Sequence, residues 1–547
     1  MEVEYRKNSN KELFSNLESV LEIKDLQNYI PLFTKFFNIS ETNYNSINLN
    51  THYRLQNLIN NENILTGFLV DDKEKVHKKN VFCKFSPLLD PIKYMIGKYD
   101  NNDPNLLKLP KFKHEITNNN KTNEPNNAAY IDGFFTYLTS KLLHNLNFIH
   151  GLDFYGSFIG LKQNLLINVE DDLEYLGNSD FFYKNLSILF NFKSTIHGDF
   201  FNSHTRNYKK RLTISDNISS INLSDITDFN HLNTLFVETP DQNNDSENPK
   251  LEFEMQIEKS VTEDSECSSR TSLTQKSGST DDNDDNDDSS FGSIESDEEA
   301  CVLIKSFPVH AICLEKCDST LDQLIVENDI SEEEWGSIVI QILFMLITYQ
   351  KIFNLTHNDL HTNNIMYINT DKQFLYYKYN NKYYKVPTFG RIFKIIDFGR
   401  AIYKFQGNII CSDSFYPNGD AATQYNFGPF LNKNKPRLEP NYSFDLCRLG
   451  CALYDFFVED DEDPETLTGI YSIIVNWCYD DKDRNILYKT NGKERYPDFK
   501  LYKMIARSVH KHTPINVIST PYFDRYIWSK KNKKQKIFNI DTLPTCT

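Results

Sequence analysis

The sequence predicts an α+β fold, with strands in the first part of the chain, helices in the second, and a large insert. Residues 64–70 and 80–85 are apolar runs on either side of a charged turn, the pattern of a β-hairpin. A long apolar run follows Ser331 and Glu334, which match the capping box of a buried helix. A strongly acidic stretch separates the two regions and indicates the insert.

The charge of the chain is concentrated in that acidic stretch. The formal net charge of the 547 residues is −17, and residues 239–300 alone hold 19 acidic and 4 basic side chains. The acidity therefore belongs to one segment, which has too few apolar residues to fold, and it says little about the partners of the rest. No basic cluster predicts a nucleic-acid-binding surface, so we expect no nucleic-acid partner.

The cysteines and the apolar runs suggest an intracellular protein. The ten Cys include no C-x-x-C pair, which argues against a zinc site or a disulfide framework. The longest apolar run, residues 338–347, is interrupted by Gln341 and is too short to span a bilayer. The N-terminus carries no apolar segment typical of a signal peptide. We therefore expect no membrane span.

The apolar pattern divides the chain into six regions. Leucines recur at helical spacing within residues 1–60, which predicts a helical N-terminal extension. The hairpin, a helix with one apolar face and a strand pair at 148–159 fill residues 61–161. There follow an ordered insert, an acidic disordered segment, a return to strands, and a mostly helical region with a C-terminal tail: residues 162–237, 238–300, 301–317 and 318–547.

Two polar motifs indicate the chemistry of the chain. Residues 357–366 read HNDLHTNNIM and residues 395–400 read IIDFGR, each beside an apolar, strand-like run. An Asp in the first motif can accept a hydroxyl proton, and an Asn and a second Asp can hold magnesium ions that bridge nucleotide phosphates. Each motif alone is weak evidence, but the two in this order strongly indicate phosphoryl transfer.

The paired motifs, H-x-D-L-x-x-x-N and D-F-G, resemble those of the eukaryotic protein-kinase superfamily. The resemblance extends from about Ile64 to the C-terminal region, with specific motifs in residues 357–399 and 445–450. It implies a bilobal protein-kinase-like fold, with a small β-rich N-lobe, a larger helical C-lobe and a large insert in the N-lobe. Residues 61–161 and 301–317 would form the N-lobe and hinge, residues 318–547 would form the C-lobe, and the chain would bind ATP and Mg²⁺.

The resemblance also implies roles for individual residues. Asp359 would be the catalytic base, and Asn364 and Asp397 would be the magnesium ligands. His357 would bond the backbone near Asp397. Asp445 lies in a stretch that resembles D-x-W-x-x-G and would bind the backbone of the catalytic loop.

Further nucleotide-binding residues are implied upstream. Lys84, in NVFCKF, resembles the strand lysine of V-A-I-K, which pairs with the α- and β-phosphates. Asp132 is the only carboxylate on the helix at 128–138 and would hold Lys84, although a position on the solvated helix surface is equally open. Glu315 and Cys317 would lie in the hinge, where backbone groups bind the adenine.

The sequence departs from the usual kinase pattern at several positions. No G-x-G-x-x-G precedes Lys84, and no A-P-E appears at the expected place. Asn358 is at the position where an Arg usually binds a phosphate group on the activation loop. We therefore predict activity that does not need such phosphorylation. His361 replaces the Lys that contacts the γ-phosphate.

The Asn richness, the missing Gly-rich loop and the stretch FCKFSPLLDP resemble serine/threonine-protein kinases of giant DNA viruses of the mimivirus type. These are in turn distantly similar to the poxvirus serine kinases of virion assembly. The resemblance implies a viral protein of the host cytoplasm that could also be packaged in the virion. Its substrate would be a protein.

Two other functions stay open at this point. Small-molecule kinases of the choline or aminoglycoside type share H-N-D-L, but the D-F-G-R-A sequence and the helix at Asp445 favour a protein substrate. A pseudokinase scaffold is the non-enzymatic alternative. The filled polar positions of both motifs argue against it, while the missing Gly-rich loop keeps it open.

Overall fold

The computed structural model describes residues 3–193 and 300–546, apart from positions 63, 102, 113–120, 429, 459–462, 498 and 530–534. The described residues all belong to one compact unit, made of Met1–Gly198 and Cys267–Thr547. The unit is a mixture of helices and strands with a curled sheet, so the predicted α+β class is confirmed.

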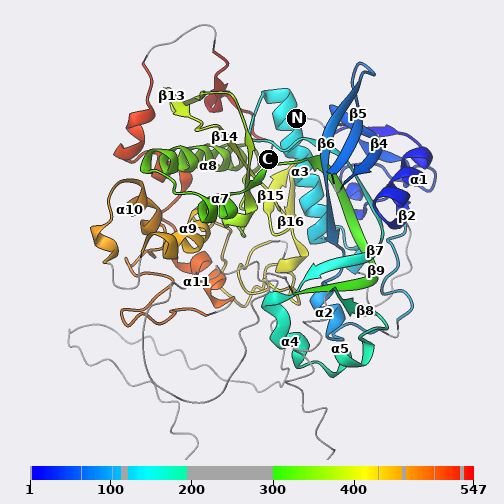
Figure 1. The fold of residues 1–547 in the computed structure, drawn as a ribbon. Helices are drawn as coiled ribbons and strands as arrows, with labels where there is room; N and C mark the ends of the chain where they lie inside the picture. The colour runs from blue at the N-terminus through cyan, green and yellow to red at the C-terminus, as the bar shows by residue number, and fades with distance from the viewer. Residues whose placement is uncertain are drawn as a thin grey trace, which may run out of the picture. The chain divides into compact units, whose positions relative to one another are not determined.

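A seven-stranded antiparallel sheet occupies the first part of the chain (Figure 1). Six strands are ordered β2-β7-β9-β6-β5-β4, and β8 pairs with β9 outside this path. The predicted hairpin is present as β5 and β6. The strands are β2 (Ile23–Gln27), β4 (Tyr53–Asn61), β5 (Ile64–Asp71), β6 (Val76–Pro87), β7 (Phe154–Asn168), β8 (Phe190–Phe192) and β9 (Cys301–Glu315).

Helix α3 (Ala128–Leu146) packs against this sheet. The Asn127 side chain caps its first turn by accepting a hydrogen bond from the amide of Ala129. His310 on β9 donates from Nδ1 to the carbonyl of Ala129, 2.8 Å away. A side chain at Gly133 would collide with the His310 ring, so this glycine lets the helix approach the strand. The close packing fixes the helix relative to the strands that carry the site.

The N-terminal region differs from the predicted helical extension. Besides the helix α1 (Lys11–Val20) and one 3-10 helix, its described elements are strands: β1 (Tyr5–Lys7), β2, β3 (Ile47–Leu49) and β4. Leu55 and Leu58 are buried three residues apart, a helical spacing, but they lie on β4, where a β-bulge shifts the register between Leu55 and Asn57. The bulge brings both leucines to one face of the sheet.

The strand pair predicted at 148–159 is not present. Half of that stretch, residues 154–159, belongs to the single long strand β7, which pairs along its length with the continuous β9. The insert begins as the end of β7 and continues through α4 (Leu173–Gly177), α5 (Asp180–Asn185) and β8. The rest of the predicted insert and the acidic segment up to residue 299 lie outside the described residues.

The second part of the chain is mainly helical. Its helices are α7 (Leu321–Glu327), α8 (Glu332–Phe353), α9 (Phe444–Phe457), α10 (Gly469–Asn476), α11 (Lys500–Ser508) and α12 (Pro514–Ile518). Its strands are β10 (Ser319–Thr320), β11 (Ile365–Asn369), β12 (Phe374–Tyr379), β13 (Lys382–Pro387), β14 (Arg391–Ile395), β15 (Ile402–Phe405), β16 (Asn408–Cys411) and β17 (Phe538–Asn539). Strands β12 and β13 form a long antiparallel hairpin.

Short helices complete the described chain. They are α2 (Pro91–Met95) and the 3-10 helices η1 (Pro31–Lys35), η2 (Lys121–Asn123), η3 (Glu170–Asp172), η7 (Thr362–Asn364), η8 (Asp413–Phe415), η9 (Pro464–Thr466), η10 (Pro521–Tyr526) and η11 (Ile540–Thr542). Of these, η7 lies in the HNDLHTNN motif and turns its last residue, Asn364, toward the strand that follows.

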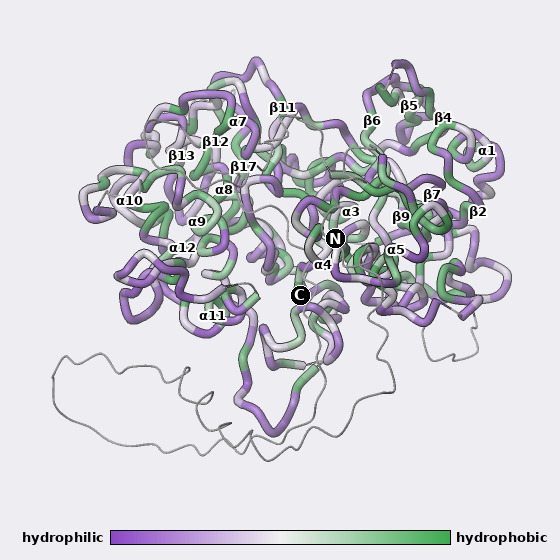
Figure 2. Tube along the Cα trace, turned by 60° about the horizontal axis from the view of Figure 1, so that its bottom comes forward, coloured by the Kyte–Doolittle hydropathy of each residue, from purple (hydrophilic) through white to green (hydrophobic). Residues whose placement is uncertain are grey.

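Helix α8 forms the centre of the apolar core. The Ser331 hydroxyl accepts from the amide of Glu334 at 3.3 Å, as the capping-box pattern predicts. Among the described helices, α8 alone is long and apolar enough to cross a membrane, and 94% of its most apolar window is buried inside the protein. Hydrophobic segments run through the inner helices and strands, whereas outer turns are hydrophilic (Figure 2). The apolar character of α8 is therefore accounted for by the core.

Candidate active site

Lys84 on β6 joins two carboxylates. Its Nζ lies 2.8 Å from Oδ2 of Asp132 on α3 and 3.0 Å from Oδ1 of Asp397, which follows β14. The Asp132 side chain is 3% exposed, so the alternative of a solvated helix surface is wrong. Its other oxygen, Oδ1, accepts from the amide of Phe398 at 2.8 Å. Asp132 therefore holds both the lysine and the D-F-G segment.

The charge of Lys84 lowers the pKa of Asp397, whereas burial raises the pKa of Asp132. Burial alone would lower the pKa of Lys84, but the negative charges of Asp132 and Asp397 outweigh it and raise the pKa. One ammonium group between two carboxylates leaves a net charge of about −1 when all three are ionised. Such a cluster attracts a further cation.

Asp397 has an unusual backbone conformation. Its φ angle is +60°, in the left-handed region that non-glycine residues rarely adopt. Residues held in this way are concentrated at active sites, where neighbouring contacts impose the conformation. Here the ion pair with Lys84 and the bond between Asp132 and the next amide supply those contacts.

The HNDLHTNN segment is held by bonds to its backbone. The Asp445 carboxylate, at the start of α9, accepts from the amides of His357 and Asn358, each at 2.9 Å. His357 donates from Nε2 to the carbonyl of Ile396, also at 2.9 Å. Both contacts match the expectations from the sequence, and they bring the two motifs together.

Asp359 is fixed from two sides. The Asn364 amide donates to the Asp359 carbonyl at 2.8 Å, and the Tyr502 hydroxyl donates to Asp359 Oδ1 at 2.8 Å. Burial acts to raise the pKa of Asp359, but the guanidinium groups of Arg400 and Arg448 outweigh it and leave the pKa lowered. Asp359 is therefore a carboxylate at neutral pH and can accept a proton.

His361 is a neutral side chain in this site. Burial lowers its pKa to about 4, against the opposing charge of Asp359. Its Nε2 lies 3.0 Å from the Asn364 amide nitrogen and accepts from it, which assigns the proton to Nδ1. Unlike the lysine that it replaces in the kinase pattern, His361 brings no positive charge.

The two predicted magnesium ligands offer oxygen atoms, which suit that ion. Asn364 directs its Nδ2 to Asp359 and His361, so its Oδ1 is the atom that can bind a cation. Asp397 binds Lys84 through Oδ1. Within the described ranges, no group of three or more His, Cys, Asp and Glu side chains is arranged to hold a metal. The residues fit a magnesium ion that takes its remaining ligands from phosphates and water.

The side chains of Glu315 and Cys317 are engaged within the protein: Glu315 forms an ion pair and Cys317 is buried. Glu315 Oε1 lies 2.6 Å from Lys394 Nζ and also accepts from the Asp153 amide at 2.8 Å. Cys317 is buried, and burial raises its pKa to about 12. The resemblance implies adenine contacts through backbone groups at this strand end, and these side-chain contacts leave that expectation open.

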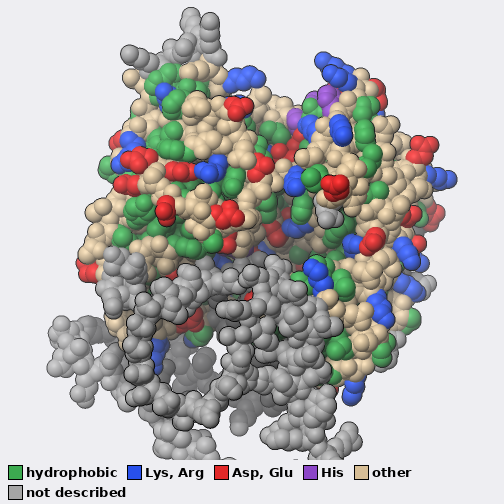
Figure 3. All heavy atoms as spheres, in the orientation of Figure 1, with side chains coloured by type: hydrophobic (Ala, Val, Ile, Leu, Met, Phe, Trp, Pro, Cys, Tyr) green, Lys and Arg blue, Asp and Glu red, His purple; other side chains and the backbone are tan. Residues whose placement is uncertain are grey.

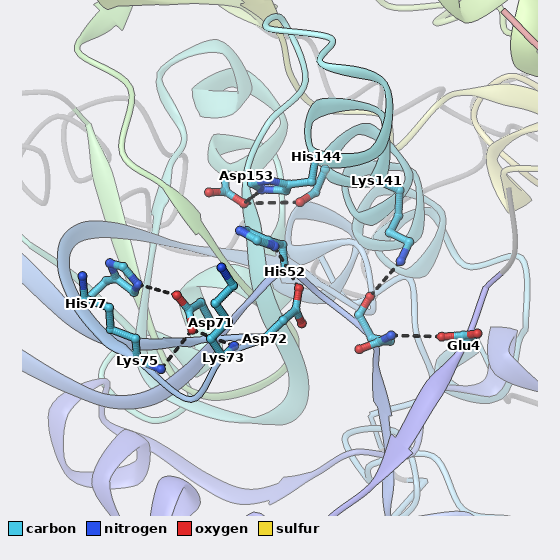
Figure 4. A network of polar contacts seen from close by, with 12 residues as sticks. Glu4, His52, Asp71, Asp72, Lys73, Lys75, His77, Lys141, His144 and Asp153 are labelled. Atoms are coloured by element: carbon cyan, nitrogen blue, oxygen red, sulfur yellow. Dashed lines mark hydrogen bonds and ion pairs between the residues drawn. The ribbon is translucent and has the colours of Figure 1, made fainter.

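Asp153 connects this strand end to a network of His–Asp contacts at the edge of the sheet (Figure 4). Its carboxylate lies 2.7 Å from the ring of His144 at the end of α3. His52 is stacked on His144 with ring centroids 4.3 Å apart, and its Nδ1 lies 2.9 Å from Asp72. These contacts tie α3 to the β5–β6 turn and steady the strand end at Glu315.

Asn358, at the position of the usual Arg, is a hydrogen-bonding anchor. It is fully buried and adopts a φ angle of +65°. Its Nδ2 donates to the carbonyl of Arg400 at 3.0 Å, and its Oδ1 accepts from the Tyr425 hydroxyl at 2.6 Å. The loop that follows D-F-G is thus attached to the HNDLHTNN segment by neutral groups.

The structure adds an element that the sequence did not indicate. Strand β4 precedes β5, and the turn between them, at residues 61–64, includes Asn61, Glu62 and Ile64. Glu62 has a φ angle of +48°, a conformation that favours glycine. In the kinase pattern the Gly-rich loop joins the two strands that precede the strand with the lysine. The β4–β5 turn is at that position here.

Four site residues were not identified from the sequence: Tyr502, Arg448, Arg400 and Lys394. Arg400 directly follows D-F-G, and Lys394 interrupts the apolar strand before it, so both carried a weak signal. Tyr502 and Arg448 lie in helices far along the chain and match no motif.

On the face shown in Figure 3, basic side chains are interspersed with acidic and apolar ones.

Comparison with known proteins adds no relative. No protein-family model matches this sequence, and no curated protein matches it.

Proposed function

We propose that this chain is an ATP-dependent serine/threonine-protein kinase that uses Mg²⁺. The observation that carries the proposal is the pair of contacts that Lys84 makes with Asp132 and Asp397, next to a loop that orients Asp359. A strand lysine that contacts a helix acid and a D-F-G aspartate is the arrangement that positions nucleotide phosphates in protein kinases.

The strand order supports a bilobal protein-kinase-like fold. The strand with Lys84 lies between β5 and β9, α3 packs on the same sheet, and β9 leads into the helical part. This order is the one expected for a small lobe followed by a hinge. The helical part from α7 onward would be the large lobe.

The site residues suggest a division of roles. Lys84 would bind the α- and β-phosphates, and Asn364 and Asp397 would hold the magnesium ion, which neutralises charge on the phosphates. Asp359 would orient the acceptor hydroxyl and receive its proton. Phe82, two residues before Lys84 and therefore on the same face of β6, is 51% exposed and offers a ring to the adenine.

The protein substrate and the viral origin belong to the same proposal. They rest on the D-F-G-R-A sequence, the helix at Asp445 and the resemblance to kinases of giant DNA viruses. A viral enzyme of this type would act in the host cytoplasm and could enter the virion. Phosphoproteins of the source particle would then decrease when Asp397→Ala replaces the natural chain.

The test is a phosphotransfer assay with purified full-length chain, radiolabelled ATP and MgCl₂. Casein and myelin-type basic protein serve as protein acceptors, and choline serves as the small-molecule acceptor. Asp359→Asn should reduce transfer to protein on the order of 10²- to 10⁴-fold while ATP binding persists. Asp371→Asn, at an exposed loop position, is the matched control and should leave transfer unchanged.

Three outcomes would contradict the proposal. Transfer to choline but not to protein would indicate a small-molecule kinase. Magnesium-dependent ATP binding without any transfer would indicate a pseudokinase scaffold. Undetectable ATP binding, or an unchanged rate in Asp359→Asn, would exclude the assigned site.

A further inference from the structure

We propose that Tyr502 is a positioning residue that orients the catalytic carboxylate of Asp359 through one oxygen and leaves the other for the acceptor. The inference rests on the proposed kinase function. Tyr502 lies on α11, 143 positions along the chain from Asp359, and its hydroxyl is 2.8 Å from Asp359 Oδ1. None of the kinase motifs in the sequence includes it.

The direction of this hydrogen bond follows from Arg448. The Arg448 Nε lies 2.9 Å from the Tyr502 hydroxyl oxygen. A guanidinium nitrogen can only donate, so the phenol oxygen accepts from Arg448 and its own proton points to Asp359. Arg448 is buried on α9, the helix whose first turn contains Asp445. The result is a chain of two hydrogen bonds from Arg448 through Tyr502 to Asp359, which we call the relay.

The Tyr502 ring is itself held in place. Phe499 stacks on it with ring centroids 5.3 Å apart and an interplanar angle of 13°. The guanidinium carbons of Arg400 and Arg448 lie 5.7 and 5.4 Å from the ring centroid, within cation–π distance. Helix α11 packs against α9 (Figure 1). The phenol therefore has little freedom to leave Asp359.

The relay supplies what the backbone contacts lack. Asp445 and Asn364 fix the main chain on either side of Asp359. They do not set the rotation of its carboxylate group. The bond from Tyr502 to Oδ1 does so, and the acceptor proton would then pass to Oδ2. Fixing a reacting group in this way raises the rate of the chemical step rather than substrate binding.

The test compares Tyr502→Phe with Tyr471→Phe, which removes a hydroxyl from a half-buried ring on α10. Tyr502→Phe should lower kcat on the order of 10- to 100-fold. The KM for ATP and for the protein acceptor should change less than about twofold, and Tyr471→Phe should match the natural chain. Arg448→Met should also lower kcat, and its loss should be smaller in the Tyr502→Phe background than in the natural chain, because part of its effect passes through the same hydroxyl.

An unchanged kcat in Tyr502→Phe would overturn the inference. A raised kcat would overturn it as well, since it would mean that the phenol occupies the place of the acceptor. A rise in KM alone would indicate a substrate-binding role instead.

A second measurement separates this inference from the proposed function. If the natural chain transfers no phosphate, the kinase proposal fails, yet the contact can still be tested by thermal unfolding. The unfolding midpoints of Tyr502→Phe, Asp359→Ala and the double variant should be non-additive, because each single change removes the same bond. Additive shifts would overturn the relay.

Discussion

Lys84 connects a strand, a helix and the D-F-G segment through one ammonium group. Because both partners are carboxylates on different elements, the lysine contributes to the local structure as well as to any phosphate contact. Removing its charge would leave Asp132, which is buried, without its counterion. A substitution that removes the charge of Lys84 should therefore lower both the affinity for the nucleotide and the stability of the fold.

We expect Lys84→Met to weaken ATP binding at least about tenfold, because it removes a charge-assisted contact with the phosphates. Its thermal midpoint should also fall, as the Asp132 carboxylate loses its partner. Isothermal titration with Mg–ATP and circular dichroism melting measure the two effects. Lys78→Met, at an exposed position of the same strand, should change neither quantity. Equal ATP affinity in both variants would contradict the role of Lys84.

His150 provides a pH-dependent contribution to stability. It is fully buried, with Nδ1 bonded to the carbonyl of Phe393 at 2.7 Å and Nε2 to the Tyr377 hydroxyl at 2.6 Å. Burial lowers its pKa to about 4 from an ordinary value of 6.5. Since the unfolded chain takes up the proton first, the stabilisation is complete above about pH 6.5 and is lost as the pH falls toward 4.

The natural chain should therefore lose about 2 kcal/mol of unfolding free energy through His150 between pH 7.5 and 5.0. His150→Gln keeps hydrogen-bonding groups and cannot take up a proton in this range. Its loss over the same interval should be smaller by that amount, although its stability at pH 7.5 will be lower. Urea denaturation at the two pH values gives the comparison, and parallel pH dependence in the two proteins would contradict this assignment.

At the scale of elements, the loop after D-F-G is attached to the catalytic segment without a phosphate. Asn358 bonds both the start of this loop, at the Arg400 carbonyl, and Tyr425 within it. These groups are neutral, so the attachment needs no added charge. The structure gives a physical reason for the expectation drawn from Asn358 in the sequence.

Phosphatase treatment of the active chain should thus leave its kcat unchanged. Tyr425→Phe, which removes the bond to Asn358, should lower kcat by about tenfold and expose the loop to limited proteolysis. Tyr416→Phe removes a hydroxyl from the same loop that contacts Glu124 rather than the catalytic segment, and serves as the control. Loss of activity on dephosphorylation would contradict the prediction.

At the scale of the whole chain, the sequence predicted the residues that lie in short motifs and missed those that meet only through long-range contacts. The motifs located Asp359, Asn364 and Asp397, and the hairpin pattern located Lys84, because each lies within a short, recognisable stretch. Asp132 was found because it is the only acid on its helix. Strand β4 was missed because the apolar spacing upstream of it predicted helix for residues 1–60, and its β-bulge interrupts the alternation of apolar residues that would have indicated a strand. Tyr502 was missed because its contact with Asp359 spans 143 positions and follows no motif.

The ion pair between Lys394 and Glu315 is another long-range contact of this kind, and it links β14 to the end of β9. Lys394 Nζ lies 2.6 Å from Glu315 Oε1 and 2.7 Å from the carbonyl of Gly151, and its side chain is 2% exposed. The contact joins the seven-stranded sheet to the segment that carries D-F-G. Removing this ion pair should lower the unfolding free energy of the whole unit.

We expect Lys394→Met to lower the unfolding free energy by about 3–5 kcal/mol, because it leaves the largely buried Glu315 carboxylate without its counterion. The double variant Glu315→Gln/Lys394→Met should be more stable than Lys394→Met alone, since it removes the unpaired charge. Lys372→Met, at an exposed loop position, should stay within about 0.5 kcal/mol of the natural chain. Urea denaturation followed by tryptophan fluorescence measures all three. A double variant less stable than Lys394→Met would show that the two side chains contribute independently, and that the sheet and the D-F-G segment are not joined by this pair.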